Sequence, residues 1–315
     1  HKELSEVLKS LRGREVILLD EISFVAEWWR AIKHEIDRDD TKILVVTGSH
    51  AVDLRKGMDQ MPGRWGGGGE FHLLPMGFDE FSAMRRQAKW PEFSRIDEME
   101  LYFRVGGFPI ALMESGPRGK DPEKARETYR RWLAGDLQKL GRQEAYLKEL
   151  LLEIAKTTTS TLSLQNLAKK TQIGSHHTAQ EYISLLSDCF ALKTLYAFEE
   201  GETEYRFRRE KKFYFTDPLL YWIAFEWADS APPDNAYEKV AELVAHESLR
   251  RRFQRIGYLK NRKGEVDFIE PGHWALEVKW AEIPKNISKL YKDLKIPQKI
   301  IWTKSNFLSE FPTKI

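Results

Sequence analysis

Two short apolar runs near the N-terminus enclose a stretch of helical periodicity. Residues 16–19 are four consecutive apolar residues between charged neighbours, a pattern typical of a strand buried on both faces of a parallel sheet. A second run of this kind lies within residues 42–49, and apolar residues recur at helical spacing over residues 24–38. This order predicts a strand–helix–strand unit with parallel strands, because such crossovers are nearly always right-handed and parallel.

Polar residues follow both predicted strands. Asp20 and Glu21 come directly after the first strand, and Thr47 and Ser49 end the second. Because ligands bind beyond the carboxyl ends of strands in open α/β sheets, we expect these side chains at one edge. A buried strand that ends in Asp-Glu at this edge has the form of a Walker B motif. Asp20 would hold Mg²⁺ on a nucleotide, and Glu21 would orient or deprotonate the attacking water. The hydroxyl of Thr47 or Ser49 would sense the γ-phosphate or hold the attacking water. The alternative is a strand that runs into an acidic loop.

The phosphate-binding parts of such a site are incomplete. Arg64 lies in a loop with further glycines at 66–69; an Arg on such a loop can act as an arginine finger, although glycine-rich loops with a surface Arg also occur without a function. No G-x-x-x-x-G-K-[ST] string is present, and the nearest imitation, residues 116–121, has no hydroxyl after its Lys and follows no strand. Since the sequence starts at His1 and enters an amphipathic helix at once, we expect a fragment whose phosphate-binding loop lies upstream.

Short helices and a β-ribbon are predicted after residue 146. Helical periodicity covers residues 147–156 and 164–170, and Ser175 caps a third helix that runs to residue 189. Two strands, at 192–196 and 213–215, then flank a charged tip. This order is the layout of a winged helix-turn-helix domain.

In DNA-binding proteins of this layout, the helix after the turn enters the major groove. The candidate base readers are His176, His177 and Gln180. Basic residues of the wing can meet phosphates; they are Arg206, Arg208, Arg209, Lys211 and Lys212. The same module often serves only for protein docking. Since adjacent side chains on a helix point about 100° apart, we expect no shared metal ion at the two histidines.

Composition narrows the protein class. Lys and Arg number 50 against 48 Asp and Glu, so only local patches can attract nucleic acid. The single cysteine, Cys189, excludes an internal disulfide and suits a reducing compartment, so a cytoplasmic location is expected. Its apolar helical surroundings indicate a buried thiol. No apolar run approaches the roughly 18 residues that a membrane span needs, so no membrane partner is expected.

A second group of chemical residues lies near the C-terminus. Asp267 and, across a predicted hairpin, Glu277 and Lys279 point away from their apolar strand neighbours. Asp followed by Glu-x-Lys is the active-site pattern of PD-(D/E)XK nucleases. Asp267 and Glu277 would bind Mg²⁺, and Lys279 would stabilise the pentavalent phosphate or lower the pKa of the attacking water. Glu242 or Glu247 of a preceding helix can add a carboxylate. The alternative is a strand face with ordinary surface charges.

Several segments, taken in order, resemble one family. Beyond the Walker B-like strand and Thr47-Gly48, these are Pro62-Gly63-Arg64, LPMGFDEF at 74–81, YFRVGGFP at 102–109 and KFYFTDP at 212–218. Together they resemble the archaeal and bacterial AAA-type ATPases that carry a C-terminal domain of the DUF4143 kind. The resemblance covers nearly the whole chain, departs from the family in the absent phosphate-binding loop and in His50, and implies ATP and Mg²⁺ as cofactors.

We therefore expect an α/β protein of three parts. Residues 1–115 would hold a partial P-loop NTPase-type parallel sheet, residues 116–220 a helical winged-helix domain, and residues 221–315 a restriction-endonuclease-like α/β domain. The preferred function is an AAA-type ATPase that couples its nucleotide state to DNA or protein binding. The alternative is a Mg²⁺-dependent DNA nuclease that the ATPase regulates. A DNA partner, a protein partner and an oligomer all stay open.

Overall fold

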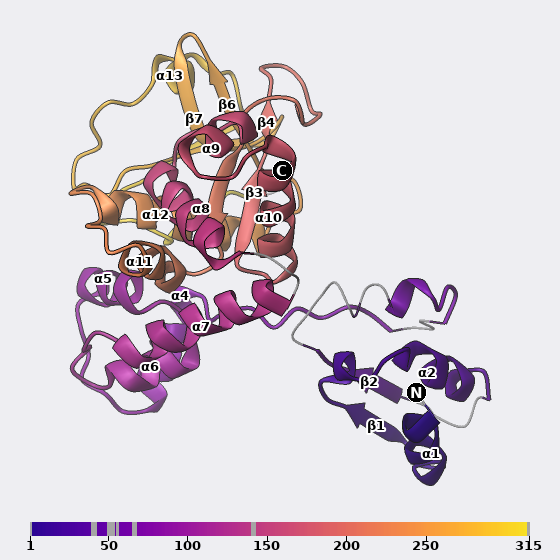
Figure 1. The fold of residues 1–315 in the computed structure, drawn as a ribbon. Helices are drawn as coiled ribbons and strands as arrows, with labels where there is room; N and C mark the ends of the chain where they lie inside the picture. The colour runs from indigo at the N-terminus through magenta and orange to yellow at the C-terminus, as the bar shows by residue number, and fades with distance from the viewer. Residues whose placement is uncertain are drawn as a thin grey trace. The chain divides into compact units, whose positions relative to one another are not determined.

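The computed structural model describes residues 2–38, 43–48, 54, 57–64, 68–139 and 143–313 (Figure 1). The chain divides into two compact units, residues 1–73 and residues 74–315. Both boundaries that the sequence predicts, at 115/116 and at 220/221, lie inside the second unit. None of the described helices is long and apolar enough to cross a membrane.

The first unit contains the predicted strand–helix–strand arrangement. Strands β1 and β2 pair in parallel, with Val16 opposite Ile43 and Leu19 opposite Val46. Helices α1 and α2 share one apolar core with the sheet, which includes Leu8, Ile17, Ile22, Trp28, Ala31, Ile32 and Met61. The described elements are α1 (Lys2–Ser10), β1 (Val16–Leu19), the 3-10 helix η1 (Ile22–Phe24), α2 (Trp28–Ile36) and β2 (Ile43–Val46).

The expectation that this sheet is buried on both faces is wrong for the described part of the unit. Ile17 is 5% exposed, whereas its neighbour Leu18 is 71% exposed and Val45, on β2, is 41% exposed. The alternation arises because α1 and α2 contribute to a core on one face of the strands. A run of four apolar residues reads the same whether one face is covered or two.

The second unit combines helices with two sheets around a large shared core. Its helices are α4 (Phe78–Gln87), α5 (Arg95–Val105), α6 (Pro109–Ser115), α7 (Glu123–Lys139), α8 (Glu144–Thr157), α9 (Leu164–Lys170), α10 (His176–Asp188), α11 (Pro218–Trp227), α12 (Ala236–Arg250) and α13 (Lys289–Asp293). Its strands are β3 (Leu192–Leu195), β4 (Ala197–Phe198), β5 (Lys212–Phe215), β6 (Gly257–Asn261), β7 (Gly264–Glu270), β8 (Trp274–Val278) and β9 (Gln298–Trp302).

The elements predicted after residue 146 are present as α8, α9, α10 and the antiparallel pair β3–β5. Ser175 caps α10, since its hydroxyl accepts a hydrogen bond from Thr178 N at 3.1 Å. Cys189, which follows this helix, is buried as predicted. Strand β4 comes directly after β3 and pairs in parallel with β6. The ribbon thereby leads straight into the C-terminal sheet, so the two parts share one core.

The C-terminal sheet has the strand order β4-β6-β7-β8-β9, in which β6, β7 and β8 are antiparallel neighbours and β8 and β9 are parallel. The pairing of β6 with β7 shifts by one residue: Gly257 lies opposite Ile269, but Leu259 lies opposite Val266. Asp267 and Phe268 therefore share one partner, Tyr258, as at a β-bulge. Bulges re-aim side chains, and this one lies at a predicted site residue.

Near the junction of the two units, one expectation fails. The sequence of residues 71–81 predicts a short strand, a Pro-Gly turn and the start of a helix. The strand at 71–74 does not form, and Phe71 and Leu73 are almost fully exposed. These residues pair with no strand among the described residues, so their apolar side chains alone do not produce one. The predicted helix that follows the Pro-Gly turn does form, as α4.

Two segments more than a hundred residues apart meet where α5 ends. Gly106 ends this helix with φ 73°, and the next residue, Gly107, donates its N–H to Asp217 Oδ2 at 2.7 Å. The other carboxylate oxygen of Asp217 accepts from Leu219 N at 2.8 Å and caps α11. Burial raises the pKa of Asp217 to about 7. Met76 N donates to Gly107 O at 2.8 Å, so one junction holds three segments of the unit.

Candidate functional sites

Three of the residues predicted in the first unit lie together at the carboxyl edge of β1 and β2. Thr47 N donates to Leu19 O at 2.9 Å, which extends the strand pairing and fixes Thr47 beside the end of β1. The Thr47 hydroxyl donates to the Asp20 carboxylate. The same hydroxyl accepts from Glu21 N at 3.2 Å. One side chain thus joins both acidic residues to the neighbouring strand.

Glu21 has an unusual backbone conformation at this edge. Its φ of 49° and ψ of 43° place it in the left-handed region, which non-glycine residues seldom adopt and which is enriched at functional sites. The next N–H, of Ile22, donates to Thr47 O at 2.9 Å and holds the turn from β1 into η1. Asp20 is exposed and Glu21 is partly exposed, so a ligand can reach both.

The donors at this edge suit Mg²⁺. Carboxylate and hydroxyl oxygens are hard ligands, and Mg²⁺ on a nucleotide is usually held by one or two carboxylates together with phosphates and waters. No group of three or more His, Cys, Asp or Glu side chains that could hold a metal occurs in the part of the chain that the structure describes. A magnesium ion at Asp20 would therefore take most of its ligands from the nucleotide and from water.

Two other predicted residues are not part of this group. Ser49 lies outside the described residues. Arg64 forms a two-point ion pair with Asp37, with Nε 2.7 Å from Oδ1 and Nη2 3.1 Å from Oδ2. The hydrogen bonds from Arg64 lower the pKa of Asp37, and those to Asp37 raise the pKa of Arg64. An arginine-finger role would require Arg64 to leave Asp37.

In the second unit, Asp267, Glu277 and Lys279 converge. Lys279 Nζ lies 2.8 Å from Glu277 Oε2 and 3.5 Å from Asp267 Oδ2. Asp267 Oδ2 also accepts a hydrogen bond from Val278 N at 2.9 Å. One lysine therefore bridges carboxylates on two adjacent strands, β7 and β8.

Lys212 also belongs to this group, although its place there was not predicted. The prediction that Lys212 is a surface residue of the wing is wrong, because its side chain is 0% exposed. Lys212 Nζ lies 3.0 Å from Glu242 Oε1, 2.6 Å from Glu265 Oε1 and 3.8 Å from Asp267 Oδ1. Tyr214 OH donates to the same Glu242 oxygen at 2.5 Å. The one available signal in the sequence was the position of Lys212, directly before the aromatic residues Phe213, Tyr214 and Phe215 of a predicted strand.

The helix carboxylate of this group is Glu242. Glu247, the other candidate, instead pairs with Arg250 at 2.9 Å and with Arg251 at 3.1 Å. Burial, followed by the charge of Asp267, raises the pKa of Glu242 and that of Glu277 to about 7. Burial lowers the pKa of Lys279, but Asp267 and Glu277 outweigh it and raise that pKa overall.

A divalent metal ion does not fit this arrangement. Both oxygens of Asp267 face ammonium groups, Lys212 on one side and Lys279 on the other. Glu277 Oε2 is held by Lys279, whereas Glu277 Oε1 is buried and has no hydrogen-bond partner among the described residues. A metal ion would have to displace an ammonium. The Mg²⁺ site predicted at Asp267 and Glu277 is therefore not assembled in this structure.

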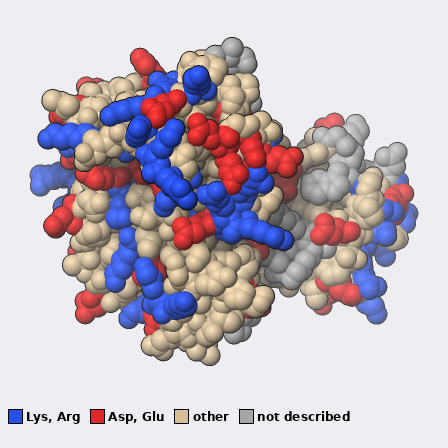
Figure 2. All heavy atoms as spheres, turned by 90° about the horizontal axis from the view of Figure 1, so that it is seen from above, with Lys and Arg blue, Asp and Glu red and all other residues tan. Residues whose placement is uncertain are grey.

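The DNA-binding candidates lie on the surface, except for Lys212, which is buried as described above. His176, His177 and Gln180 are exposed in the first turns of α10, and the two histidine rings lie 4.1 Å apart. Arg208 is exposed as well. Lys211 instead folds back on its own loop, because Nζ donates to Phe207 O at 3.0 Å. Figure 2 looks onto the end of the second unit that carries β6, β7 and α13, where Lys and Arg side chains gather with acidic ones among them.

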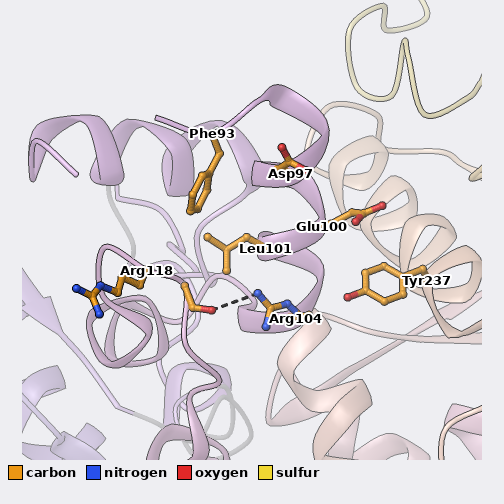
Figure 3. Close-up of a pocket in the computed structure, with 8 residues that line it drawn as sticks. Phe93, Asp97, Glu100, Leu101, Arg104, Arg118 and Tyr237 are labelled. Carbon is orange, nitrogen blue, oxygen red and sulfur yellow. Dashed lines mark hydrogen bonds between the residues drawn. The ribbon is translucent and has the colours of Figure 1, made fainter. Parts of the chain in front are cut away.

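A hollow of about 340 Å³ in the second unit contains none of the predicted residues (Figure 3). Arg104 crosses it and donates from Nη2 to Gly119 O at 3.2 Å. Glu100 at its rim pairs with Lys304 at 3.0 Å. The lining residues are Phe93, Asp97, Glu100, Leu101, Arg104, Arg118, Gly119 and Tyr237. Acidic and basic groups are both present, so the lining favours no single class of ligand.

The first candidate site lies in a segment that matches a model of a known protein family. Residues 1–82 match a family model described as an AAA domain, and residues 96–230 match one described as a domain of unknown function, DUF8612. Neither model spans half of the chain. The second bears a different designation from DUF4143. A search of curated proteins gave no match.

Among solved structures, the chain is similar to the Aeropyrum pernix ORC1 protein in complex with DNA. The two are 13% identical with a TM-score of 0.31, over 80% of this chain and 69% of that chain. At these values the likeness carries no argument about function. The family model is the informative match: the segment that holds Asp20, Glu21 and Thr47 is similar to an AAA-type domain.

Proposed function

We propose that the protein is an AAA-type ATPase whose nucleotide site lies at the carboxyl edge of β1 and β2. The observation that carries this proposal is the Thr47 hydroxyl, which joins the Asp20 carboxylate to the backbone of Glu21. It lies inside the segment that matches the AAA domain model. Asp20 would hold Mg²⁺, which neutralises charge on the phosphates, and Glu21 would orient or deprotonate the attacking water.

The remaining roles follow from the same edge. Thr47 donates a hydrogen bond to Asp20, which would hold the carboxylate in position for a metal ion. We propose Ser49 as a sensor of the γ-phosphate, and Arg64 as an arginine finger once its pairing with Asp37 is released. Both roles depend on a protein that also carries a phosphate-binding loop, and this sequence contains no such motif.

The Thr47→Ala variant of the intact protein tests this site. Removing the hydroxyl takes away the group that orients Asp20 and the acceptor of Glu21 N–H. Loss of a residue that orients a metal ligand typically costs about 10- to 100-fold in activity, and we expect a decrease of that size in Mg²⁺-dependent phosphate release from ATP. Ser10→Ala is the matched control, since the Ser10 hydroxyl is exposed and donates to Val7 O within α1. Parental turnover in Thr47→Ala would contradict the proposed site.

The nucleotide state would be coupled to DNA or protein binding through α8, α9, α10 and the β3–β5 ribbon, acting as a winged helix-turn-helix module. In support, His176, His177 and Gln180 are exposed at the start of the helix that follows the turn. Arg208, on the loop before β5, is exposed with no ion pair among the described residues. It is therefore available for a phosphate, whereas Lys211 is bound to its own loop.

Arg208→Ala is expected to weaken binding of the intact protein to double-stranded DNA about equally for all sequences. The logarithmic salt dependence of the affinity should fall by about one unit, as for the loss of one phosphate contact. Fluorescence anisotropy over a range of salt concentrations measures both quantities. Lys120→Ala removes an exposed charge outside the module and serves as the control. An unchanged salt slope in Arg208→Ala would count against a DNA-binding role for this loop.

The second candidate function is a Mg²⁺-dependent DNA nuclease. The convergence of Asp267, Glu277 and Lys279 favours it, whereas the ammonium groups that hold these carboxylates argue against it. We therefore propose that the C-terminal part keeps a nuclease-like arrangement of strands and serves in binding. Cleavage of DNA by the intact protein with Mg²⁺, abolished by Lys279→Ala, would restore the nuclease assignment.

A further inference from the structure

We propose that the ammonium of Lys212 occupies the cation position among a group of buried and half-buried carboxylates of the second unit. This part of the protein would then fold without a divalent metal ion. The inference concerns Glu242, Glu265, Asp267 and Glu277, which we call the carboxylate cluster. It does not depend on the proposed ATPase function.

The position of Lys212 is central to the cluster. It lies on β5, Glu242 lies on α12, and Glu265 and Asp267 lie on β7, so one side chain connects three elements. An ammonium has three N–H donors and no acceptor. Lys212 Nζ has two carboxylate oxygens within hydrogen-bonding distance, at 2.6 and 3.0 Å, and a third at ion-pair distance, 3.8 Å.

Charge explains why a lysine is stable there. Burial alone lowers the pKa of Lys212, but Glu242, Tyr214, Asp267 and Glu265 outweigh it and raise that pKa well above its ordinary value. The side chain is fully buried, and its Nζ lies within hydrogen-bonding distance of oxygens of Glu242 and Glu265. The ring of Tyr258 lies 5.7 Å from Nζ and adds a favourable cation–π contact.

The carboxylates depend on this ammonium in turn. Buried carboxylates of like charge repel one another, and a divalent cation is one way to hold them together. Here Lys212 faces Asp267 Oδ1 and Lys279 faces Oδ2, so two single charges stand on either side of one carboxylate. A metal ion would compete with both ammonium groups for the same oxygens. The two lysine side chains therefore exclude a metal ion from this position both sterically and electrostatically.

The first test measures metal binding by a chain in which the carboxylate cluster and Lys212 are unchanged. Residues 1–315 carrying Asp20→Ala, which removes the N-terminal candidate ligand, are titrated with Mn²⁺ in the absence of nucleotide. We expect no saturable binding by electron paramagnetic resonance and no shift of the melting temperature. Saturable binding that Asp267→Asn abolishes would overturn the inference.

The second test removes the ammonium. Lys212→Ala, in the same background, is expected to melt at a lower temperature in a chelator, and Mn²⁺ should raise that temperature and bind to the cluster. Lys260→Ala is the control, because Lys260 reaches Glu265 at 3.4 Å from the exposed rim; it should gain no Mn²⁺ site. A folded Lys212→Ala variant that binds no Mn²⁺, and whose melting temperature Mn²⁺ does not raise, would overturn the inference.

A further variant covers failure of Lys212→Ala to fold. Lys212→Met combined with Glu242→Gln removes one charge of each sign at similar volume. It should fold in the chelator with a cooperative melting transition. If the double variant also fails to fold, and Mn²⁺ restores neither variant, then charge balance is not the role of Lys212 and the inference is wrong.

Discussion

Gly107→Ala is expected to lower the free energy of unfolding of the second unit by about 3 kcal/mol or more. A Cβ atom at position 107 would lie 1.9 Å from the carbonyl oxygen of Met76. Since the obstacle is backbone and not the end of a flexible side chain, the chain must move. That movement breaks the hydrogen bond from Gly107 N to Asp217 and leaves a buried carboxylate with one donor fewer.

Equilibrium unfolding in urea, followed by circular dichroism and tryptophan fluorescence, measures this loss. Gly174→Ala is the matched control, because a Cβ there meets nothing within 4 Å and its φ lies outside the left-handed region. We expect the control to unfold at the parental urea concentration and Gly107→Ala at a clearly lower one. Equal midpoints for both variants would show that the junction of α5 with Asp217 does not hold the unit together.

Local signals in the sequence explain what could be predicted of the fold. The helix that begins after Ser175 follows from a cap and a periodic apolar face, both encoded within a dozen residues. The meeting of Asp20 with Thr47 needed only one additional rule, that parallel strands bring their carboxyl ends to one edge. Where short-range pattern and a general topological rule suffice, the prediction and the structure agree.

The errors arise where distant residues decide the outcome. Nothing near Lys212 in the sequence shows that Glu242 and Asp267 will surround it, so a basic pair before a strand reads as surface charge. Arg64 stays a proposed arginine finger, but the sequence did not predict its ion pair with Asp37, 27 residues away. The apolar residues at 71–74 resemble a strand, but strand formation needs a partner that the pattern cannot supply.

In the intact protein, Glu21→Gln is expected to reduce ATP turnover by about 10²- to 10⁴-fold while ATP binding stays near the parental affinity. A general base contributes about this much to rate, and Gln keeps the shape of Glu without its basicity. The N–H of residue 21 still donates to Thr47, so the edge of the sheet should keep its geometry. Asp20→Ala, by contrast, should weaken binding of the Mg²⁺–nucleotide complex as well, because it removes the proposed metal ligand.

The most direct test of the nucleotide site is therefore one paired measurement on the intact Glu21→Gln protein: the affinity for Mg²⁺–ATP and the rate of phosphate release in the same preparation. Glu6→Gln, which changes an exposed glutamate of α1 in the same unit, is the control. The proposed function predicts near-parental affinity with hydrolysis all but lost in Glu21→Gln, and parental values for both quantities in the control. Hydrolysis by Glu21→Gln at the parental rate would contradict it.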